Sequence, residues 1–174
     1  MNFESIDKKE NKYLFSGYAS LFNNIDHQND VIIKDAFEKE GLNGLYPLLW
    51  QHDKTKPIGK IIKIFEDKNG LYVTCEINLE LSLGKEVSIM IDDKIMNYLS
   101  IGYTPLEYDY SSSTSSMERI RTIRRIKLWE VSVVTFPANQ SAKIFQQKGN
   151  VNPKFDENLL KIQKLSYLAK EKNE

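Results

Sequence analysis

The sequence contains few of the residues on which several classes of site depend. Among 174 residues there is one cysteine, Cys75, and there are two histidines, His27 and His52. A single cysteine excludes an internal disulfide and a multi-cysteine zinc site, and histidine chemistry has only two candidates. Lys and Arg total 24, as do Asp and Glu, so no net positive charge would attract nucleic acid.

Long apolar segments are also missing. No run approaches the roughly 18 residues of a membrane-spanning helix, and the initial segment MNFESIDKKENK is too polar for a secretory signal. We therefore expect an intracellular protein with no membrane and no nucleic-acid partner. The glycine motifs of nucleotide-binding loops are absent as well, which disfavours nucleotide chemistry. The length suits one domain with a sizeable core.

The spacing of apolar residues predicts a structure made mostly of strands. Strands are predicted over residues 13–21, 47–51, 58–67, 71–79, 99–108 and 118–136. The pair Asn69-Gly70 separates two of these segments and is a strong signal for a β-hairpin.

Helices and loops have fewer candidates. Residues 83–97 carry apolar side chains at helical spacing and predict an amphipathic helix with Ser82 as its cap. A short helix from Asp35 to Glu40 is also expected. The serine-rich segment 111–116 predicts a loop. Beyond Pro153, apolar residues at helical spacing predict a helix over 154–171.

Two residues at predicted strand ends are candidates for chemistry. His52 follows an apolar strand and precedes a turn, so it either reaches a cleft or is a surface turn residue. Ser100 lies where the predicted helix gives way to a strand, followed by Ile101 and Gly102. The hydroxyl of Ser100 is a useful nucleophile only if a base lies beside it. Otherwise Ser100 is simply a cap or turn residue. His27 lies in a polar loop, where a solvated side chain is the simpler interpretation.

Glu130 is unusual because it interrupts the apolar segment LWEVSVVTF. Strand periodicity places it on one face with Leu128, Ser132, Val134 and Phe136. Either that face is exposed, or the carboxylate is buried and needs a partner. The partner would be an arginine of the preceding segment, at position 119, 121, 124 or 125, or a histidine ring that the carboxylate orients.

A metal site is the remaining possibility from residue types alone. The potential ligands are Asp26, His27, Asp30, His52 and Asp53. They lack a recognised ligand spacing such as H-E-x-x-H. We expect neither a metal nor a cofactor, and a metal-dependent hydrolase built around the two histidines remains an alternative.

Six segments in order resemble the motifs of one protein family. They are GYASLFN (17–23), PLLWQHD (47–53), PIG (57–59), GLYV (70–73), LSIGY (99–103) and LWEVSVVTFPAN (128–139). Together they are similar to the prohead, or capsid maturation, proteases of tailed bacteriophages, over roughly residues 12–145. The resemblance implies an α+β fold related to the herpesvirus assembly protease: a mostly antiparallel β-barrel flanked by helices. Residues 1–148 would form this domain, and 149–174 a C-terminal helical tail.

The resemblance also implies a function. Such a protein is a serine endopeptidase that works inside the procapsid, in the bacterial cytoplasm. It cleaves the scaffold protein, or the scaffolding segment of the major capsid protein, and often itself. Those proteins are the expected partners, and a homo-oligomer such as a dimer is expected. The alternative is a scaffold-type assembly module that kept the fold and lost activity.

The family motifs also suggest a role for each candidate residue. His52 in WQHD matches the general base, and Ser100 in LSIG matches the nucleophile. Herpesvirus relatives use a second histidine as the third member, but His27 does not lie in a matching motif. The third role therefore goes to Glu130 in WEVS, with Asp30 and Asp26 as the fallbacks.

Overall fold

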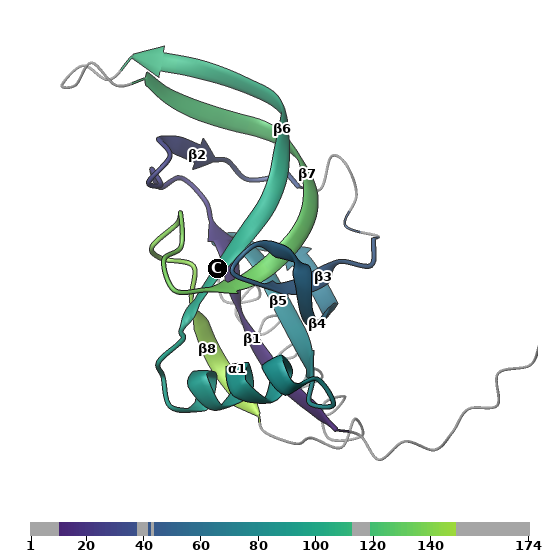
Figure 1. Ribbon diagram of the computed structural model, residues 1–174. Helices are drawn as coiled ribbons and strands as arrows, with labels where there is room; N and C mark the ends of the chain where they lie inside the picture. Colours follow the sequence, from purple (N-terminus) through teal and green to yellow (C-terminus); the bar gives the residue numbers. More distant parts are fainter. Residues whose placement is uncertain (1–10, 38–41, 43, 113–118, 149–174) are drawn as a thin grey trace, which may run out of the picture.

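The computed structural model describes residues 11–37, 42, 44–112 and 119–148, and these ranges form eight strands and one helix (Figure 1). In chain order the elements are β1 (Lys12–Leu21), β2 (Asp30–Ile32), β3 (Pro47–Trp50), β4 (Asp53–Glu66), β5 (Gly70–Asn78), α1 (Ser82–Asp92), β6 (Tyr98–Ser112), β7 (Arg119–Val134) and β8 (Ile144–Lys148). Within these ranges no helix is long and apolar enough to cross a membrane.

One sheet contains all eight strands, and β7 is the strand with the most neighbours. The sheet order is β2-β7-β3-β4-β5-β1-β8, with β6 paired to β7 outside this path. Strand β6 runs antiparallel to β7 along almost its whole length, whereas β2 and β3 pair with β7 in parallel. Since a strand has two edges, β2 and β3 must share the edge of β7 that β6 leaves free.

The sheet curls until its far strand returns to the start of β6. An isolated antiparallel bridge joins Tyr98 to Lys143. Two backbone hydrogen bonds reinforce it, from Leu99 N to the Ala142 oxygen (3.1 Å) and from Ile144 N to the Asn97 oxygen (2.9 Å). The result is a half-barrel, over which the long β6–β7 hairpin bends (Figure 1).

The expected fold is therefore confirmed in part. The structure is mostly strands arranged in a curled half-barrel, and their pairing is mostly antiparallel, with β2–β7 and β3–β7 as the parallel pairs. Several flanking helices were expected, and the part of the chain that the structure describes contains one, α1. At the expected short helix, residues 34–37 form a turn and Asp35 has a φ of 67°, which a helix cannot contain. The predicted helix over 154–171 lies outside the described residues.

Local signals were more accurate for the hairpin than for the helix ends. The Asn69-Gly70 turn is confirmed between β4 and β5, and the Asp67 carboxylate accepts both of its backbone N–H groups, at 2.7 and 3.0 Å. Helix α1 ends at Asp92 rather than at residue 97, and its N-cap is Leu81 rather than the expected Ser82, with no side-chain capping hydrogen bond. Ser111, expected in a loop, continues β6 opposite Ile120.

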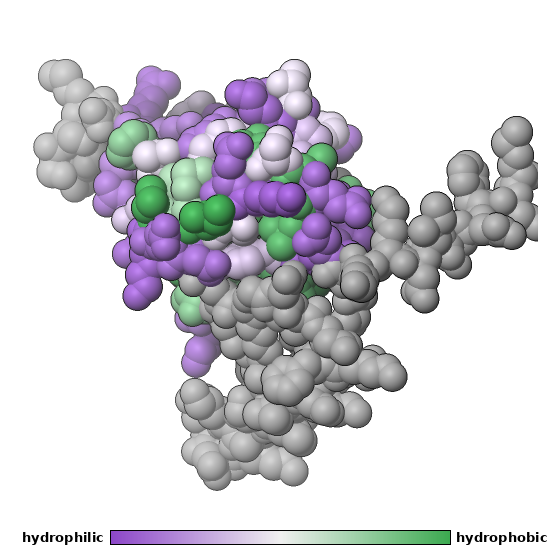
Figure 2. Space-filling view, turned by 60° about the horizontal axis from the view of Figure 1, so that its bottom comes forward, coloured by the Kyte–Doolittle hydropathy of each residue, from purple (hydrophilic) through white to green (hydrophobic). Residues whose placement is uncertain are grey.

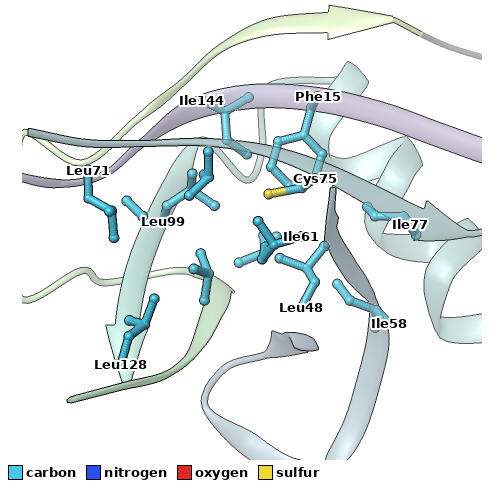
Figure 3. Packing of buried hydrophobic residues seen from close by; sticks show 14 of the residues in the cluster. Phe15, Leu48, Ile58, Ile61, Leu71, Cys75, Ile77, Leu99, Leu128 and Ile144 are labelled. Atoms are coloured by element: carbon cyan, nitrogen blue, oxygen red, sulfur yellow. The ribbon is translucent and has the colours of Figure 1, made fainter. Parts of the chain in front are cut away.

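The hydrophobic core fills the concave side of the curled sheet. Fully buried side chains come from strands far apart in the sequence and include Phe15, Leu48, Ile58, Leu71, Ile77 and Leu99 (Figure 3). Helix α1 contributes Val87 and Ile91, both 0% exposed. Cys75 lies within this core, where burial raises the pKa of its thiol, so it packs as a small apolar residue.

Some apolar side chains remain exposed at the surface. Figure 2 shows them as small groups among hydrophilic residues on the face that it presents. Ile89 and Ile95 are more than half exposed. Scattered apolar residues of this kind are common on monomeric proteins and do not by themselves define an interface.

Candidate active site

His52 lies in a tight turn between β3 and β4. Trp50 pairs with Asp53, so Gln51 and His52 form a two-residue hairpin loop, with φ values of 55° and 59°. Both central residues of a type I′ turn need positive φ, and residues other than glycine, asparagine or aspartate adopt it at a cost. Contacts with the end of β7 hold the turn: Gln51 N donates to the Val133 oxygen (3.0 Å), and Gln51 Nε2 donates to Thr135 Oγ1 (2.7 Å).

Ser100 and Glu130 lie on the same face of the β6–β7 ladder. Ser100 is opposite Ser132 in the register, and Gly102 is opposite Glu130. Because side chains alternate along a strand, these four residues share one face. Ser100, Ser132 and Glu130 are all buried, at 6%, 0% and 8% exposure. Strands β6, β7 and β3 are neighbours, so they bring the serine, the carboxylate and the histidine turn together.

The buried carboxylate of Glu130 has a histidine as its partner. Glu130 Oε1 lies 2.6 Å from His52 Nδ1. Three of the four arginines considered as alternatives pair elsewhere: Arg121 with Asp30, Arg124 with Asp109 and Arg125 with Glu107. A carboxylate in this position fixes the proton of the imidazole on Nδ1 and leaves Nε2 free to accept another.

Gly102 makes room for that carboxylate. A Cβ atom at Gly102 would lie 2.3 Å from Glu130 Oε1 and 2.9 Å from its Cγ. No side chain can occupy this space while Glu130 contacts His52. The glycine two residues after the candidate serine thus makes space for the carboxylate of the paired strand.

Ser100 and His52 line one cavity of about 360 Å³. The loop residues 26–28 and 136–139 also line this cavity. Among the described residues the His52 ring bonds to Glu130, and the Ser100 hydroxyl makes no hydrogen bond to it. In serine hydrolases without bound substrate, the bond between nucleophile and base is often long and shortens only when substrate binds. The His52 side chain is 43% exposed and also borders a second cavity of about 760 Å³, beside Trp129 and Glu130.

The two fallback carboxylates are engaged elsewhere. Asp30, which is 1% exposed, binds Arg121 through two hydrogen bonds of 2.7 and 2.6 Å and accepts the Tyr103 hydroxyl at 2.6 Å. Burial and this bond to Asp30 raise the pKa of Tyr103, which stays a donor. Asp26 accepts the backbone N–H groups of Gln28 and Asp30, and burial raises its pKa. Both carboxylates therefore stabilise the loop that forms one wall of the cavity.

Three of the candidate metal ligands, Asp26, His27 and His52, line the same cavity. His27 Nε2 lies 2.7 Å from Gln140 Nε2, and Asp53 accepts bonds from Thr55 that lower its pKa. Across the described ranges no three His, Cys, Asp or Glu side chains are placed to hold a metal ion.

Sequence reasoning missed two contributors to this site. Gln51 was assigned only to a strand, and Ser132 only to the face of Glu130. For Ser132 a signal existed, because alternation places it beside Glu130, but its bond to the His52 turn is a tertiary contact. For Gln51 the two-residue spacing between Trp50 and Asp53 was the available clue.

Comparison with known proteins agrees with this architecture. The sequence model of the caudovirus prohead serine proteases matches residues 1–154. The chain is 30% identical over 155 residues to the prohead protease of Enterobacteria phage HK97, covering 83% of this chain and 67% of that one. It is 31% identical over 145 residues to the prohead protease of Escherichia phage T5, covering 80% and 66%. It thus spans about two thirds of the length of these relatives.

The fold also resembles a solved herpesvirus protease. The KSHV protease, crystallised with a hexapeptide phosphonate inhibitor, superimposes with a TM-score of 0.51 at 12% identity, over 76% of this chain and 63% of that one. At this identity the likeness concerns the fold alone. The match over most of the chain, together with the two phage relatives, shows that the chain belongs to the caudovirus prohead serine protease family, the peptidases of phage capsid maturation.

Proposed function

We propose that this chain is a serine endopeptidase with Ser100 as nucleophile, His52 as general base and Glu130 as the residue that orients His52. The observation that carries the proposal is the 2.6 Å contact between Glu130 and His52 Nδ1, in a site whose cavity also contains Ser100. A serine hydroxyl becomes a useful nucleophile when a positioned base takes its proton. A carboxylate that holds the imidazole in one tautomer completes this arrangement.

The reaction is acyl transfer. Ser100 Oγ attacks the scissile carbonyl while His52 Nε2 takes its proton, and Glu130 stabilises the imidazolium that forms. His52 then gives the proton to the leaving amine, and water hydrolyses the acyl-enzyme with the same base. A positioned base typically contributes about 10²–10⁴-fold to the rate.

The substrate proposal rests on family membership. We propose that the enzyme cleaves the scaffold protein or the scaffolding segment of the major capsid protein, and also itself, inside the procapsid in the bacterial cytoplasm. The capsid and scaffold proteins are its partners, and the active form is a homo-oligomer. Residues 1–148 are proposed as the protease domain and 149–174 as a separate tail.

A time course of intact masses tests this function. The purified protein, alone and co-expressed with its major capsid protein, should yield defined fragments, and a fluorophosphonate probe should block the cleavage. Mapping of the probe adduct should locate it on Ser100. Absence of cleavage and of adduct in assembled shells would contradict the proposal and favour the inactive assembly module. Cleavage stopped by a chelator but not by the probe would favour the metal-dependent alternative.

Gly102→Ala should lower the cleavage rate by on the order of 10²-fold, because a shift of about 1 Å in a catalytic geometry has an effect of this size. The added methyl group would meet the end of a flexible side chain, Glu130, so the carboxylate moves away from His52 while the fold persists. Single-turnover rates measure the effect on catalysis, and urea denaturation measures whether the fold persists. In a Glu130→Ala background the same change should cost little. An equal loss in both backgrounds would show that Gly102 acts through something else.

A further inference from the structure

We propose that Ser132 is a positioning residue that fixes the His52 turn and the Glu130 carboxylate in one arrangement. This inference rests on the proposed function. Ser132 lies two residues after Glu130 on β7. Its position directly across the ladder from Ser100 places it at the centre of the site.

The hydroxyl of Ser132 closes a ring of hydrogen bonds. Ser132 Oγ accepts the backbone N–H of His52 at 3.1 Å and donates to Glu130 Oε2 at 2.7 Å. The other oxygen of Glu130 contacts His52 Nδ1 at 2.6 Å. The ring therefore runs from the His52 backbone through Ser132 and Glu130 to the His52 imidazole, and it fixes both ends of that residue.

Only a hydroxyl group satisfies this position. One atom must accept from an N–H group and donate to a carboxylate, which a serine or threonine oxygen can do. Ser132 is 0% exposed, so bulk water is not available to replace the hydroxyl without rearrangement. Removal of the oxygen would leave the His52 N–H and Glu130 Oε2 each without this partner.

The turn needs such a restraint because its backbone is unfavourable. Gln51 and His52 both have positive φ, and such conformations persist only where surrounding contacts hold them. Gln51 is held by Val133 and Thr135, and Ser132 provides the corresponding contact to His52. Without it the turn can relax, and the imidazole moves relative to Ser100. We therefore expect Ser132→Ala to slow the reaction of Ser100 by about 10–100-fold.

The test measures the reactivity of Ser100 with a fluorophosphonate probe, which needs no knowledge of the substrate. Serine Oγ forms a bond to phosphorus, fluoride leaves and His52 takes the proton. The variants are Ser132→Ala, Ser132→Thr and the matched control Ser16→Ala, which removes a buried strand hydroxyl bonded to Thr74 at 3.1 Å. The maximal labelling rate and the half-saturating probe concentration are fitted separately, and NMR follows the imidazole N–H that faces Glu130.

We expect Ser132→Ala to have a lower maximal labelling rate, a nearly unchanged half-saturating probe concentration and a shifted imidazole N–H signal. Ser132→Thr should recover the labelling rate and the signal position. Ser16→Ala should match the wild type in both readouts. A wild-type rate and an unshifted signal in Ser132→Ala would overturn the role of Ser132 but not the proposed function. An equal loss in Ser16→Ala would also overturn it, as would a folded Ser132→Thr that recovers nothing. A wild-type protein that never labels at Ser100 would instead overturn the proposed function.

Discussion

Ser100→Ala should abolish self-cleavage and cleavage of the capsid protein. Loss of a nucleophile that acts together with a histidine base typically lowers kcat by about 10⁶-fold. The alanine fits the site, since Ser100 is buried at 6% exposure and alanine is smaller than serine. Stability should therefore change little, and intact masses over time should remain those of the uncut chains. Wild-type fragment patterns in this variant would show that another group performs the cleavage.

The two histidines provide a matched comparison for the same reaction. His52→Ala should approach the loss of Ser100→Ala, because both belong to one proton-transfer unit and their effects do not add. His27 lines the same cavity, but among the described residues its ring contacts Gln140 rather than a carboxylate, so His27→Ala should leave most of the activity. Cleavage that depends equally on both histidines would contradict the roles assigned here.

Asp30→Ala should lower the free energy of unfolding by about 3–5 kcal/mol, the typical cost of removing one partner from a buried ion pair. Asp30 is 1% exposed, and its carboxylate accepts three hydrogen bonds, two from Arg121 and one from Tyr103. The replacement removes the carboxylate that the guanidinium and the phenol share as an acceptor. Urea denaturation should show a lower midpoint with an unchanged slope.

Asp109→Ala is the control for Asp30→Ala, because it also removes an Asp–Arg pair that involves the β6–β7 hairpin. The Asp109 side chain is 62% exposed and pairs with Arg124, which is 50% exposed. Exposed ion pairs contribute about 0–1 kcal/mol, so this variant should be nearly as stable as the wild type. Equal losses in both variants would show that burial is not what makes the Asp30 pair important. The double variant Asp30→Ala with Arg121→Ala should recover part of the stability.

The sequence by itself determined the local elements whose signals depend on neighbouring residues. The Asn69-Gly70 hairpin, the strand alternation from residue 13 and the amphipathic α1 segment all follow from short-range spacing. The ordered motifs also carried the family resemblance, and with it the candidates His52, Ser100 and Glu130. Local sequence patterns could not predict that these three residues lie together, because positions 52, 100 and 130 are far apart along the chain.

Only the tertiary structure decided which side chains meet. Parallel pairing of β3 with β7 brings the His52 turn beside Glu130, and the β6–β7 register places Ser100 and Gly102 across from Ser132 and Glu130. Asp30, equally acceptable by residue type, binds Arg121 instead. The physical reason is that a strand pattern specifies which face a side chain takes, whereas its partner depends on strand order and register. Those are fixed by the packing of the whole sheet.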